Sequence, residues 1–524
     1  MSLPASLLKD LTALVGDDCV IVDEAERAYF SQDVSGISDS LTGAIVQPNT
    51  KEELAQVVKL AVEAGVAILP RGGGMSYTNG YCPQSSKSLS IDTQRLNRII
   101  EVNSEDMYVT VEAGCTWKSL YEDLLEKGLR TPYWGTLSGI YATVGGSVSQ
   151  NSIFFGSGQF GTAADSVLAF EIVLADGSIM KTGAAAVKGG SPFMRHYGPD
   201  LTGLFTSDAG ALGVKATITL RLIRQPKYDA HCSYNFPTVD SMFEAASSVA
   251  RAGLASESFG FDPVLHGQRM KRESMSRDLK SLGNVMKKSG SVFSAMKEGI
   301  KIAFAGRRYM EDVIYAYNFS TESHSQQGAK DAIHAIEKIA ENAGGLAVEN
   351  SIPQIVRANP FVPLNNMVGP QGERWLPVHG LVPHSKAIDC VHELNKAFSS
   401  HEKAIKEHGI EIGYLFATVS SNISVVELVF FWPDKLEEIQ KRTVEKSVLK
   451  RFTDFGDRPD ARALVQELKN HALKIYQEMG STHLQIGRTY PYHQSLDPAT
   501  FALVKNLKKS LDPKGLINPG VLGL

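Results

Sequence analysis

Three glycine-rich loops, each beside a predicted strand, constrain the fold of this chain more than any other feature. The first loop, Arg71-Gly72-Gly73-Gly74-Met75-Ser76, follows the apolar segment 66–70. Consecutive glycines accept positive φ angles and allow backbone N–H groups to converge on an anion. The sequence therefore predicts an anion-binding loop that suits a diphosphate. Its spacing is neither G-x-G-x-x-G nor G-x-x-x-x-G-K-[ST], so the standard dinucleotide and nucleoside-triphosphate fingerprints do not apply.

The second and third loops are richer in small residues. The second spans 143–161 and contains Gly145-Gly146-Ser147 and Gly156-Ser157-Gly158; the third spans 200–214 and places glycines and hydroxyl groups just before a predicted strand. Small residues at this density admit a flat ligand close to the backbone. Three such loops in one part of the chain favour a ligand site over isolated turns.

The order of predicted elements is that of a mixed helix and sheet protein. Residues 43–74 predict a strand, a helix over 50–65 and a second strand, because the apolar residues change from a run to helical spacing and back. Asp176-Gly177 lies between two alternating apolar runs and predicts a hairpin. Further helices are predicted at 116–127 and 327–343. After Arg224 the strand-rich portion of the sequence gives way to longer mixed segments, which predicts a domain boundary.

Length, charge and cysteine usage narrow the class of protein. A chain of 524 residues is expected to divide into at least two domains. A net charge of -4 argues against a nucleic-acid partner. No CxxC pair is present, which argues against a structural zinc site, an iron–sulfur cluster or a disulfide framework. The N-terminus lacks the apolar core of a signal peptide, so we expect a cytoplasmic protein. The basic stretch 269–308 reads first as a solvated helical face, and second as a contact for an acidic electron acceptor or a membrane surface.

Taken together, these loops resemble those of the vanillyl-alcohol oxidase/p-cresol methylhydroxylase flavoprotein superfamily. The tail 511–520, Leu-Asp-Pro-Lys-Gly-Leu-Ile-Asn-Pro-Gly, is similar to the ending with which these enzymes return to the flavin. The resemblance implies FAD as cofactor and an α+β fold, in which a two-part FAD-binding domain carries an inserted α+β cap that covers the substrate. The expected boundaries are 1–224 for the FAD-binding domain, 225–475 for the cap and 476–524 for the returning C-terminal segment.

The same resemblance assigns the residues that contact FAD. They are Arg71, Gly72, Gly73, Gly74, Met75, Ser76, Thr143, Gly145, Gly146, Ser147, Asn151, Gly158, Gly161, Asp165, Gly210, Gly213, Val214 and Asn518. Some relatives attach the flavin covalently through a histidine of the first loop, but Met75 occupies that place here and cannot form the bond. His379 is the remaining candidate for a covalent link.

Candidates for catalysis lie in the segment 483–493. Arg488 is a candidate for holding a substrate carboxylate or phenolate, or the charge of the reduced flavin, since a guanidinium is always ionised and forks onto oxygens. His483 and His493 are candidate proton acceptors. Tyr490 is expected to wall the substrate and offer a hydroxyl. For each of the four, an ordinary structural role is the alternative.

These expectations lead to a flavoenzyme acting on a small alcohol. The strands over 411–433 resemble the aromatic-alcohol branch of the superfamily, so the leading hypothesis is oxidation of an aryl or aryl-alkyl alcohol, or an alkylphenol, to a carbonyl product. The alternative is a D-2-hydroxy-acid dehydrogenase of the lactate or glycolate type, although the His-rich metal motif of such enzymes is missing. A non-catalytic protein that retains the fold is a third hypothesis. Oxygen, a cytochrome or a quinone is the expected electron acceptor, and a homo-oligomer is an open alternative.

Overall fold

The computed structural model describes residues 3–272 and 315–524 and divides the chain into two compact units. The first unit comprises Met1–Ile153, Thr162–Arg224 and His483–Leu524. The second comprises Phe154–Gly161 and Gln225–Thr482. The first unit thus draws on both ends of the chain. The boundary after Arg224 lies where the strand-rich portion of the sequence gives way to longer mixed segments. The chain returns to the first unit at His483.

One sheet of the first unit carries the first glycine loop at the end of a strand. Its strand order is β1 (Val20–Ile21), β4 (Ala44–Val46), β6 (Ser88–Asp92) and β5 (Ala67–Arg71), and β6 pairs in parallel with both β4 and β5. Helix α3 (Lys51–Glu63) connects β4 to β5 and buries its apolar stripe in the core together with α1 (Ala5–Val15). The Thr50 side chain caps α3 by accepting a hydrogen bond from the Glu53 amide at 3.1 Å. The predicted strand, helix and strand are confirmed.

The other main sheet of the first unit is antiparallel. Its order is β11 (Ile179–Lys181), β10 (Val167–Val173), β12 (Val214–Arg221), β8 (Tyr108–Glu112) and β7 (Ile99–Asn103). The predicted hairpin forms between β10 and β11, where Gly177 has a φ of 81° and the Ser178 amide donates to Asp176 at 2.8 Å. Helix α4 (Trp117–Glu126) confirms the prediction over 116–127. Short elements complete this part: α2 (Glu24–Phe30), β2 (Gln32–Asp33), β3 (Gly36–Ile37), β9 (Leu129–Arg130), α5 (Val144–Gln150), α7 (Leu201–Leu204) and β13 (Ile223–Arg224).

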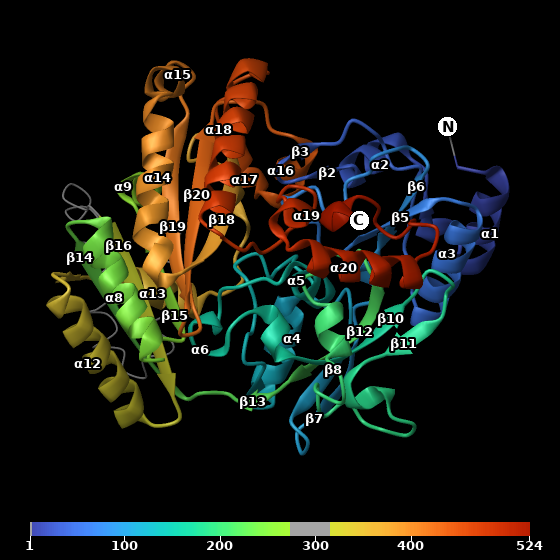
Figure 1. The fold of residues 1–524 in the computed structure, drawn as a ribbon, viewed down its shortest axis with the longest axis horizontal. Helices are drawn as coiled ribbons and strands as arrows, with labels where there is room; N and C mark the ends of the chain where they lie inside the picture. The colour runs from blue at the N-terminus through green and yellow to red at the C-terminus, as the bar shows by residue number, and fades with distance from the viewer. Residues whose placement is uncertain (1–2, 273–314) are drawn as a thin grey trace. The chain divides into compact units, whose positions relative to one another are not determined.

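The C-terminal segment joins the first sheet at its β5 edge. After α19 (Tyr492–Ser495) and α20 (Pro498–Leu511), Ile517 forms a parallel bridge with Ile68 of β5. The Ile68 amide donates to the Leu516 carbonyl and the Asn518 amide donates to the Ile68 carbonyl, each at 2.7 Å. Figure 1 shows this red end of the chain among the blue N-terminal elements. The tail motif therefore lies next to the strand that leads into the first glycine loop.

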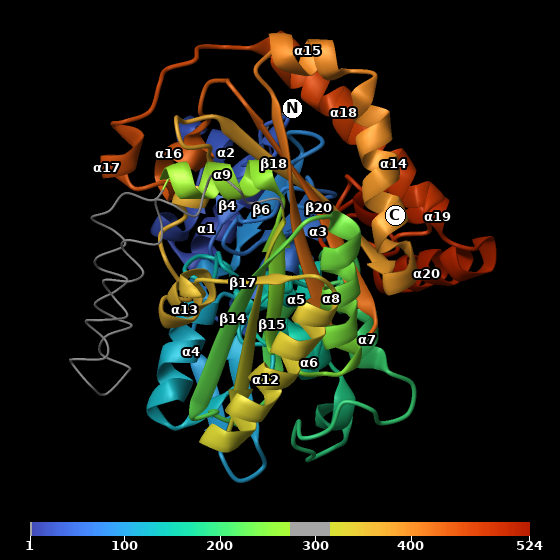
Figure 2. The ribbon, with the colours of Figure 1, turned by 90° about the vertical axis from the view of Figure 1, so that its left-hand side faces the viewer.

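A seven-stranded antiparallel sheet forms the second unit. Its order is β17 (Leu346–Val348), β14 (Tyr228–Phe236), β16 (Tyr315–Ser323), β15 (Glu257–Phe261), β19 (Glu411–Val419), β20 (Ile423–Trp432) and β18 (Arg374–Pro383). One face is covered by α8 (Val239–Arg251), α12 (Gln326–Asn342), α14 (Ala387–Ser399) and α18 (Pro459–Glu478), and the other carries α9 (Pro263–Arg272) and α13 (Ser351–Ala358) (Figure 2). Shorter helices are α6 (Ser157–Phe160), α15 (Glu402–Glu407), α16 (Glu438–Thr443) and α17 (Lys446–Leu449).

The segment Phe154–Gly161 corrects the expected domain division. We expected it in the FAD-binding domain, but it packs within the second unit. The Gly158 amide donates to the Ser256 carbonyl at 2.9 Å, and the Ser420 amide donates to the Ser157 carbonyl at 3.0 Å. The chain therefore leaves the first unit after Ile153 and returns at Thr162, which separates the two halves of the second glycine-rich loop.

The basic stretch 269–308 is only partly covered by the described residues. The basic stretch lies, from Glu273 onward, outside the described residues. Within the part of the chain that the structure describes, no helix combines the length and apolar character needed to cross a membrane.

Asp262 in the second unit generates a prediction about the pH dependence of stability. It accepts hydrogen bonds from the amides of Leu265 and Tyr414, both at 2.9 Å, but burial raises the pKa of its carboxyl to about 6 from 3.8. A raised pKa means that the folded state binds the proton more tightly, so this group loses its stabilising effect as the pH rises from about 4 to about 6. Two pKa units correspond to about 3 kcal/mol.

Replacing Asp262 by Asn keeps a side-chain oxygen that can accept hydrogen bonds and removes the ionisable carboxyl group. We expect D262N to gain stability relative to the wild type as the pH is raised from 4 to 7, by up to about 3 kcal/mol. Urea unfolding at several pH values measures this difference, with D10N, a variant of an exposed carboxylate, as a control. Parallel pH profiles for wild type and D262N would contradict the prediction.

Candidate cofactor-binding and active site

The first and second glycine loops are in direct backbone contact. A Cβ atom on Gly73 would lie 1.9 Å from the Tyr141 carbonyl oxygen, and one on Gly72 would lie 2.3 Å from Thr143 Oγ1. Of the three consecutive glycines, only Gly74 has a positive φ, at 71°. Gly72 and Gly73 are thus required by close approach of the two loops, and the predicted conformational reason applies to Gly74 alone.

Arg71 places a buried positive charge behind this loop. Its guanidinium carbon lies 4.0 Å from the Phe30 ring centroid, 4.8 Å from that of Tyr29 and 5.4 Å from that of Tyr81. None of its three guanidinium nitrogens has a hydrogen bond of good geometry among the described residues. Burial alone lowers the pKa of Arg71, but the neighbouring Tyr81, Tyr29 and Asp92 raise it above its ordinary value. The loop is therefore backed by a cation that has no hydrogen-bonded anion.

The second loop is fixed by its own polar side chains. Thr143 begins α5 by accepting a hydrogen bond from the Gly146 amide at 3.1 Å, and Gly145 approaches Ala113 so closely that a Cβ would lie 2.7 Å from its carbonyl oxygen. The Ser147 hydroxyl accepts from the Trp117 indole at 2.7 Å. Asn151 ends the helix with a φ of 53°. These contacts give the motif a rigid backbone, so any cofactor meets a preformed surface.

The third loop is organised by Asp208. This carboxylate accepts hydrogen bonds from the Gly210 amide at 3.0 Å, the Leu212 amide at 3.4 Å and the ammonium group of buried Lys215 at 2.6 Å. The Ser207 amide donates to the Val148 carbonyl at 3.0 Å, which ties this loop to the second one. Asp208 was not among the residues predicted to contact FAD, although it lies in the middle of the 200–214 motif.

Several predicted cofactor residues have a structural explanation of their own. A Cβ on Gly213 would lie 2.4 Å from a methyl carbon of Ile172, and Val214 is buried in β12. Asp165 caps a turn by accepting from the Thr162 amide and hydroxyl at 2.7 and 2.8 Å. Gly158 packs on the second unit, where a Cβ would lie 2.3 Å from the Ala255 carbonyl oxygen. Gly161 ends α6 in the same unit with a φ of 82°. Contact of these five residues with FAD stays a prediction.

The tail brings the first and third loops together through Asn518. Its side-chain amide donates to the Gly80 carbonyl at 2.7 Å and to the Ala209 carbonyl at 2.8 Å. Its side-chain oxygen accepts from Arg488 at 3.2 Å. The first loop, the second loop up to Ile153, the third loop and the tail therefore all belong to the first unit.

The hydrogen bonds of Arg488 differ from those expected of a substrate-binding arginine. Its Nε donates to the Pro519 carbonyl at 3.2 Å, Nη1 donates to the carbonyls of Asn79 and Cys82, and Nη2 donates to Asn518 at 3.2 Å and Pro519 at 2.7 Å. A guanidinium has five N–H groups, so none is left for a substrate carboxylate or phenolate. Burial also lowers the pKa of Arg488. Arg488 is a structural clamp that attaches the C-terminal segment, and the substrate-binding role predicted for it is not supported.

The two candidate histidines have different surroundings in the structure. The rings of His483 and Tyr490 are stacked, with centroids 4.0 Å apart and planes at 15°, and Tyr490 is buried. His493 is exposed and stacks on Phe501 at 3.9 Å, at the start of α20. A half-buried imidazole against a tyrosine suits proton transfer better than one packed on a surface helix. His483 and Tyr490 remain the catalytic candidates.

His379 and Met75 bear on covalent attachment. His379 is buried in β18, where its cross-strand neighbour in β20 is Glu427. Met75 and Ser76 follow Gly74 in the first loop, and the Ser76 hydroxyl contacts that of Thr78 at 3.2 Å. A covalent bond from His379 stays a prediction.

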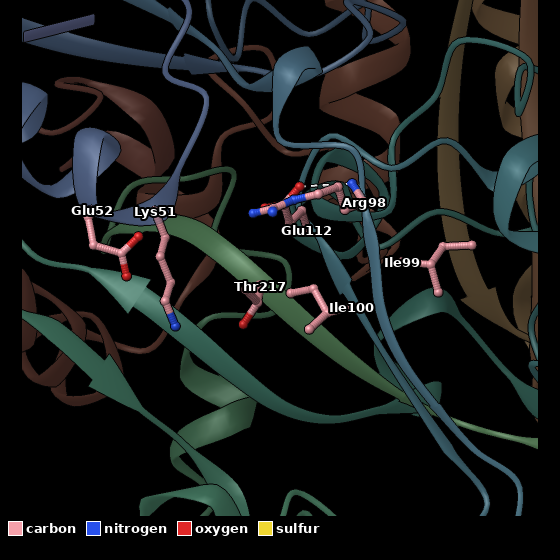
Figure 3. A pocket seen from close by; sticks show the side chains of 7 residues that line it. All are labelled: Lys51, Glu52, Arg98, Ile99, Ile100, Glu112 and Thr217. Atoms are coloured by element: carbon pink, nitrogen blue, oxygen red, sulfur yellow. Dashed lines mark hydrogen bonds and ion pairs between the residues drawn. The ribbon is translucent and has the colours of Figure 1, made fainter.

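A surface pocket of about 360 Å³ lies elsewhere in the first unit (Figure 3). It is lined by Lys51, Glu52, Arg98, Ile99, Ile100, Glu112 and Thr217. Arg98 is paired with Glu112 at 2.6 Å and Lys51 with Glu171 at 2.8 Å, so both cations of the pocket are paired with protein carboxylates. None of the predicted cofactor or catalytic residues lines it.

Comparison with known proteins agrees with this convergence of motifs. Residues 42–183 match the model of the FAD binding domain, and residues 486–522 match that of the FAD linked oxidases, C-terminal domain. The fold is similar to that of p-cresol methylhydroxylase with substrate bound (TM-score 0.74, 16% identity, 99% of this chain and 96% of that chain). It is also similar to 4-ethylphenol oxidase from Gulosibacter chungangensis (TM-score 0.72, 16% identity, 99% and 97%). The chain thus contains an FAD binding domain and a C-terminal domain of FAD linked oxidases, and its fold is like that of p-cresol methylhydroxylase. The predicted α+β fold class and the predicted cofactor are confirmed.

The names of the curated relatives refer to hydroxy acids and not to phenols. Glycolate oxidase subunit GlcD of Bacillus subtilis is 27% identical over 230 residues, which are 44% of this chain and 47% of that protein. The mitochondrial D-lactate dehydrogenase [cytochrome] of Arabidopsis thaliana is 30% identical over 253 residues, or 48% and 43%. These matches span less than half of either relative. A probable mitochondrial D-lactate dehydrogenase of Danio rerio is 23% identical over 519 residues, or 98% and 91%.

The residues around the first loop fit FAD. Arg71 supplies a buried positive charge without a hydrogen-bonded counterion, and its guanidinium lies directly against Gly74, where a Cβ would be 2.4 Å from Nη2. A diphosphate is the part of FAD that carries negative charge, so the first loop suits it. The small residues of the second and third loops would then meet the rest of the cofactor.

Substitution of Arg488 tests the structural role assigned here. We expect R488A to destabilise the protein by about 3 kcal/mol or more, because several buried carbonyl groups lose their donors. R488K should recover little of the lost stability, since one ammonium group cannot reach the carbonyls of Asn79 and Cys82 and that of Pro519 at once. The matched control is R95A, which removes an exposed pair with Asp18 and should cost less than about 1 kcal/mol.

Urea unfolding of the FAD-loaded proteins measures these differences. Anaerobic stopped-flow reduction of the remaining folded R488A supplies the second readout. A normal unfolding midpoint together with a much slower reduction would restore the catalytic role and contradict the clamp.

Proposed function

We propose that this FAD-linked oxidoreductase oxidises an aryl or aryl-alkyl alcohol, or an alkylphenol, to a carbonyl product. Bound FAD would supply the hydride acceptor, so an alcohol that gives a hydride from its carbinol carbon and its hydroxyl proton to a base becomes the carbonyl. An alkylphenol that loses a hydride and its phenol proton becomes a quinone methide, which takes up water to give an alcohol that a second oxidation converts to the carbonyl. Electrons then pass to oxygen, a cytochrome or a quinone. The observation that carries the proposal is an aromatic cluster on the sheet face of the second unit that bears α9 and α13.

Five phenylalanines form this aromatic cluster: Phe154, Phe155, Phe259, Phe261 and Phe361. Ring centroids lie 5.5 Å apart for Phe154 and Phe259, 5.9 Å for Phe155 and Phe361, and 5.7 Å for Phe259 and Phe261. Phe154 and Phe361 are only half-buried, so they retain ring surface. Such surface favours a flat apolar substrate, because aromatic rings pack edge to face or offset against one another. Structural neighbours named for p-cresol and 4-ethylphenol are consistent with this choice.

A D-2-hydroxy acid is the second candidate. It is favoured by the relatives named as D-lactate dehydrogenases and a glycolate oxidase subunit. A hydroxy acid brings a carboxylate, for which proteins commonly supply a forked arginine. Arg488 was the arginine predicted for that purpose, and all of its N–H groups are used by the protein. This favours the aromatic alcohol over the hydroxy acid.

Anaerobic addition of substrate to the purified yellow protein tests the substrate class. We expect benzylic alcohol or 4-ethylphenol to bleach the flavin absorbance at least tenfold faster than D-lactate at equal concentration. The reverse order would establish the hydroxy-acid alternative. A protein that takes up FAD but is bleached by neither class would refute both. Acid precipitation of the same sample tests His379, since a colourless pellet would exclude a covalent link.

His483 is proposed as the base that accepts the hydroxyl proton. We expect H483A to slow flavin reduction by about a hundredfold or more, the usual scale for general base catalysis. H493A is the matched control, because His493 is exposed and stacked on Phe501. It should reduce at nearly the wild-type rate. Equal rates for H483A and wild type, with normal FAD content, would remove His483 from the mechanism.

A further inference from the structure

The second unit contains a group of metal-ligating side chains that the proposed function does not use. His401 lies in the turn between α14 and α15, whereas Glu467 and His471 lie on α18. Residues four apart in a helix lie on the same face, so Glu467 and His471 point together. One ligand atom from each of the three residues lies within 4.8 Å of the others. The ends of α14, α15 and α18 are neighbours in both views (Figures 1 and 2).

The hydrogen bonds of His401 determine which ring nitrogen is available. The Ser400 hydroxyl donates to the Ala397 carbonyl at 3.0 Å, so its oxygen can accept from His401 Nδ1, which is 2.9 Å away. Nδ1 also faces the Ala397 carbonyl at 3.4 Å, and a carbonyl only accepts. The ring proton therefore belongs on Nδ1. This leaves the lone pair of Nε2 directed toward Glu467 Oε1 at 3.4 Å.

A lone pair facing a carboxylate oxygen calls for a cation between them. A proton would satisfy His401 and Glu467 as an ion pair. It would not explain the second imidazole, whose ring centroid lies 5.1 Å from that of His401. A divalent metal accepts electron pairs from both imidazoles and the carboxylate at once. Orientation of a ligand histidine by a hydrogen bond from its other nitrogen to the backbone is also typical of metal sites.

We propose that His401, Glu467 and His471 bind one divalent transition-metal ion of the zinc class. Two imidazoles and one carboxylate form a ligand set that zinc commonly uses, with water at the remaining position. The His401 side chain is 20% exposed and that of Glu467 is 56% exposed, so an ion can reach the site from solvent. Bound metal would link the turn after α14 to α18 and stabilise the second unit. The proposal is independent of the substrate of the flavin site.

Equilibrium dialysis of the FAD-loaded protein against ZnCl2, after removal of metal with a chelator, tests the site. We expect the wild type to bind one more Zn²⁺ per chain than H471A, and to bind it at least about tenfold more tightly than either H471A or E467Q. Zn²⁺ should raise the unfolding temperature of the wild type and leave that of both variants unchanged.

The matched control is H334A. His334 Nδ1 pairs with Glu337 at 2.8 Å on α12, which is a histidine–glutamate contact without a third ligand. H334A should bind Zn²⁺ as the wild type does. The proposal is overturned if H471A and E467Q, folded by circular dichroism, retain the same zinc stoichiometry and affinity as the wild type. It is equally overturned if the wild type binds no zinc.

Discussion

The attachment of the C-terminal segment to the glycine loops is the interaction on which the rest of the cofactor region depends. Arg488 donates to the Cys82 carbonyl, which follows the first loop, and to the Pro519 carbonyl of the C-terminal segment. The Asn518 side chain donates to the carbonyls of Gly80 and Ala209. Lys508 adds hydrogen bonds to the Ala211 and Ile517 carbonyls and an ion pair with Asp512 at 2.7 Å. Backbone carbonyls that are buried without donors are costly, so these cations and the loops they hold are mutually dependent. The arrangement of the loops therefore depends on these contacts with the C-terminal segment.

Much of this region was predictable, because the loops use residues whose chemistry is local. Thr50 caps α3 and Gly177 turns the hairpin, and both signals are read from a few neighbouring residues. The glycines of the first loop were predicted to contact FAD, and the structure gives two of them a further role. Gly73 is required because the Tyr141 carbonyl lies where its Cβ would be. Close approach of two chain segments leaves no local pattern, so the sequence indicates the glycine without revealing its neighbour.

The role of Arg488 and the course of residues 154–161 could not be predicted for the same reason. An arginine next to a catalytic motif can serve a substrate or the backbone, and the difference lies in carbonyls from residues that are remote in sequence. The segment 154–161 contains glycines like those of the cofactor loops, but Gly158 packs on Ala255 of the second unit. The group of His401, Glu467 and His471 shows the limit as well: the spacing on α18 is visible in the sequence, whereas the third ligand arrives from another helix pair.

A charge network supports the face of the second unit that carries the aromatic cluster. Arg357 contacts two buried carboxylates, Glu257 at 2.6 Å and Glu322. Burial alone lowers the pKa of Arg357, but the two carboxylates raise it above its ordinary value. Glu257 also accepts from the Gly156 amide at 3.0 Å, so one carboxylate fixes both α13 and the segment that contains Phe154.

This network fixes the backbone and the rings of the aromatic cluster. Removing a partner from a buried ion pair is strongly destabilising, so Arg357, Glu257 and Glu322 resist independent change. Phe259 and Phe261 follow Glu257 on the same face of β15, since residues two apart in a strand point the same way. The positions of their rings are thus fixed by these buried charges. Selectivity for a flat, apolar substrate would then depend on Phe154 and Phe361, the members of the aromatic cluster that keep exposed ring surface.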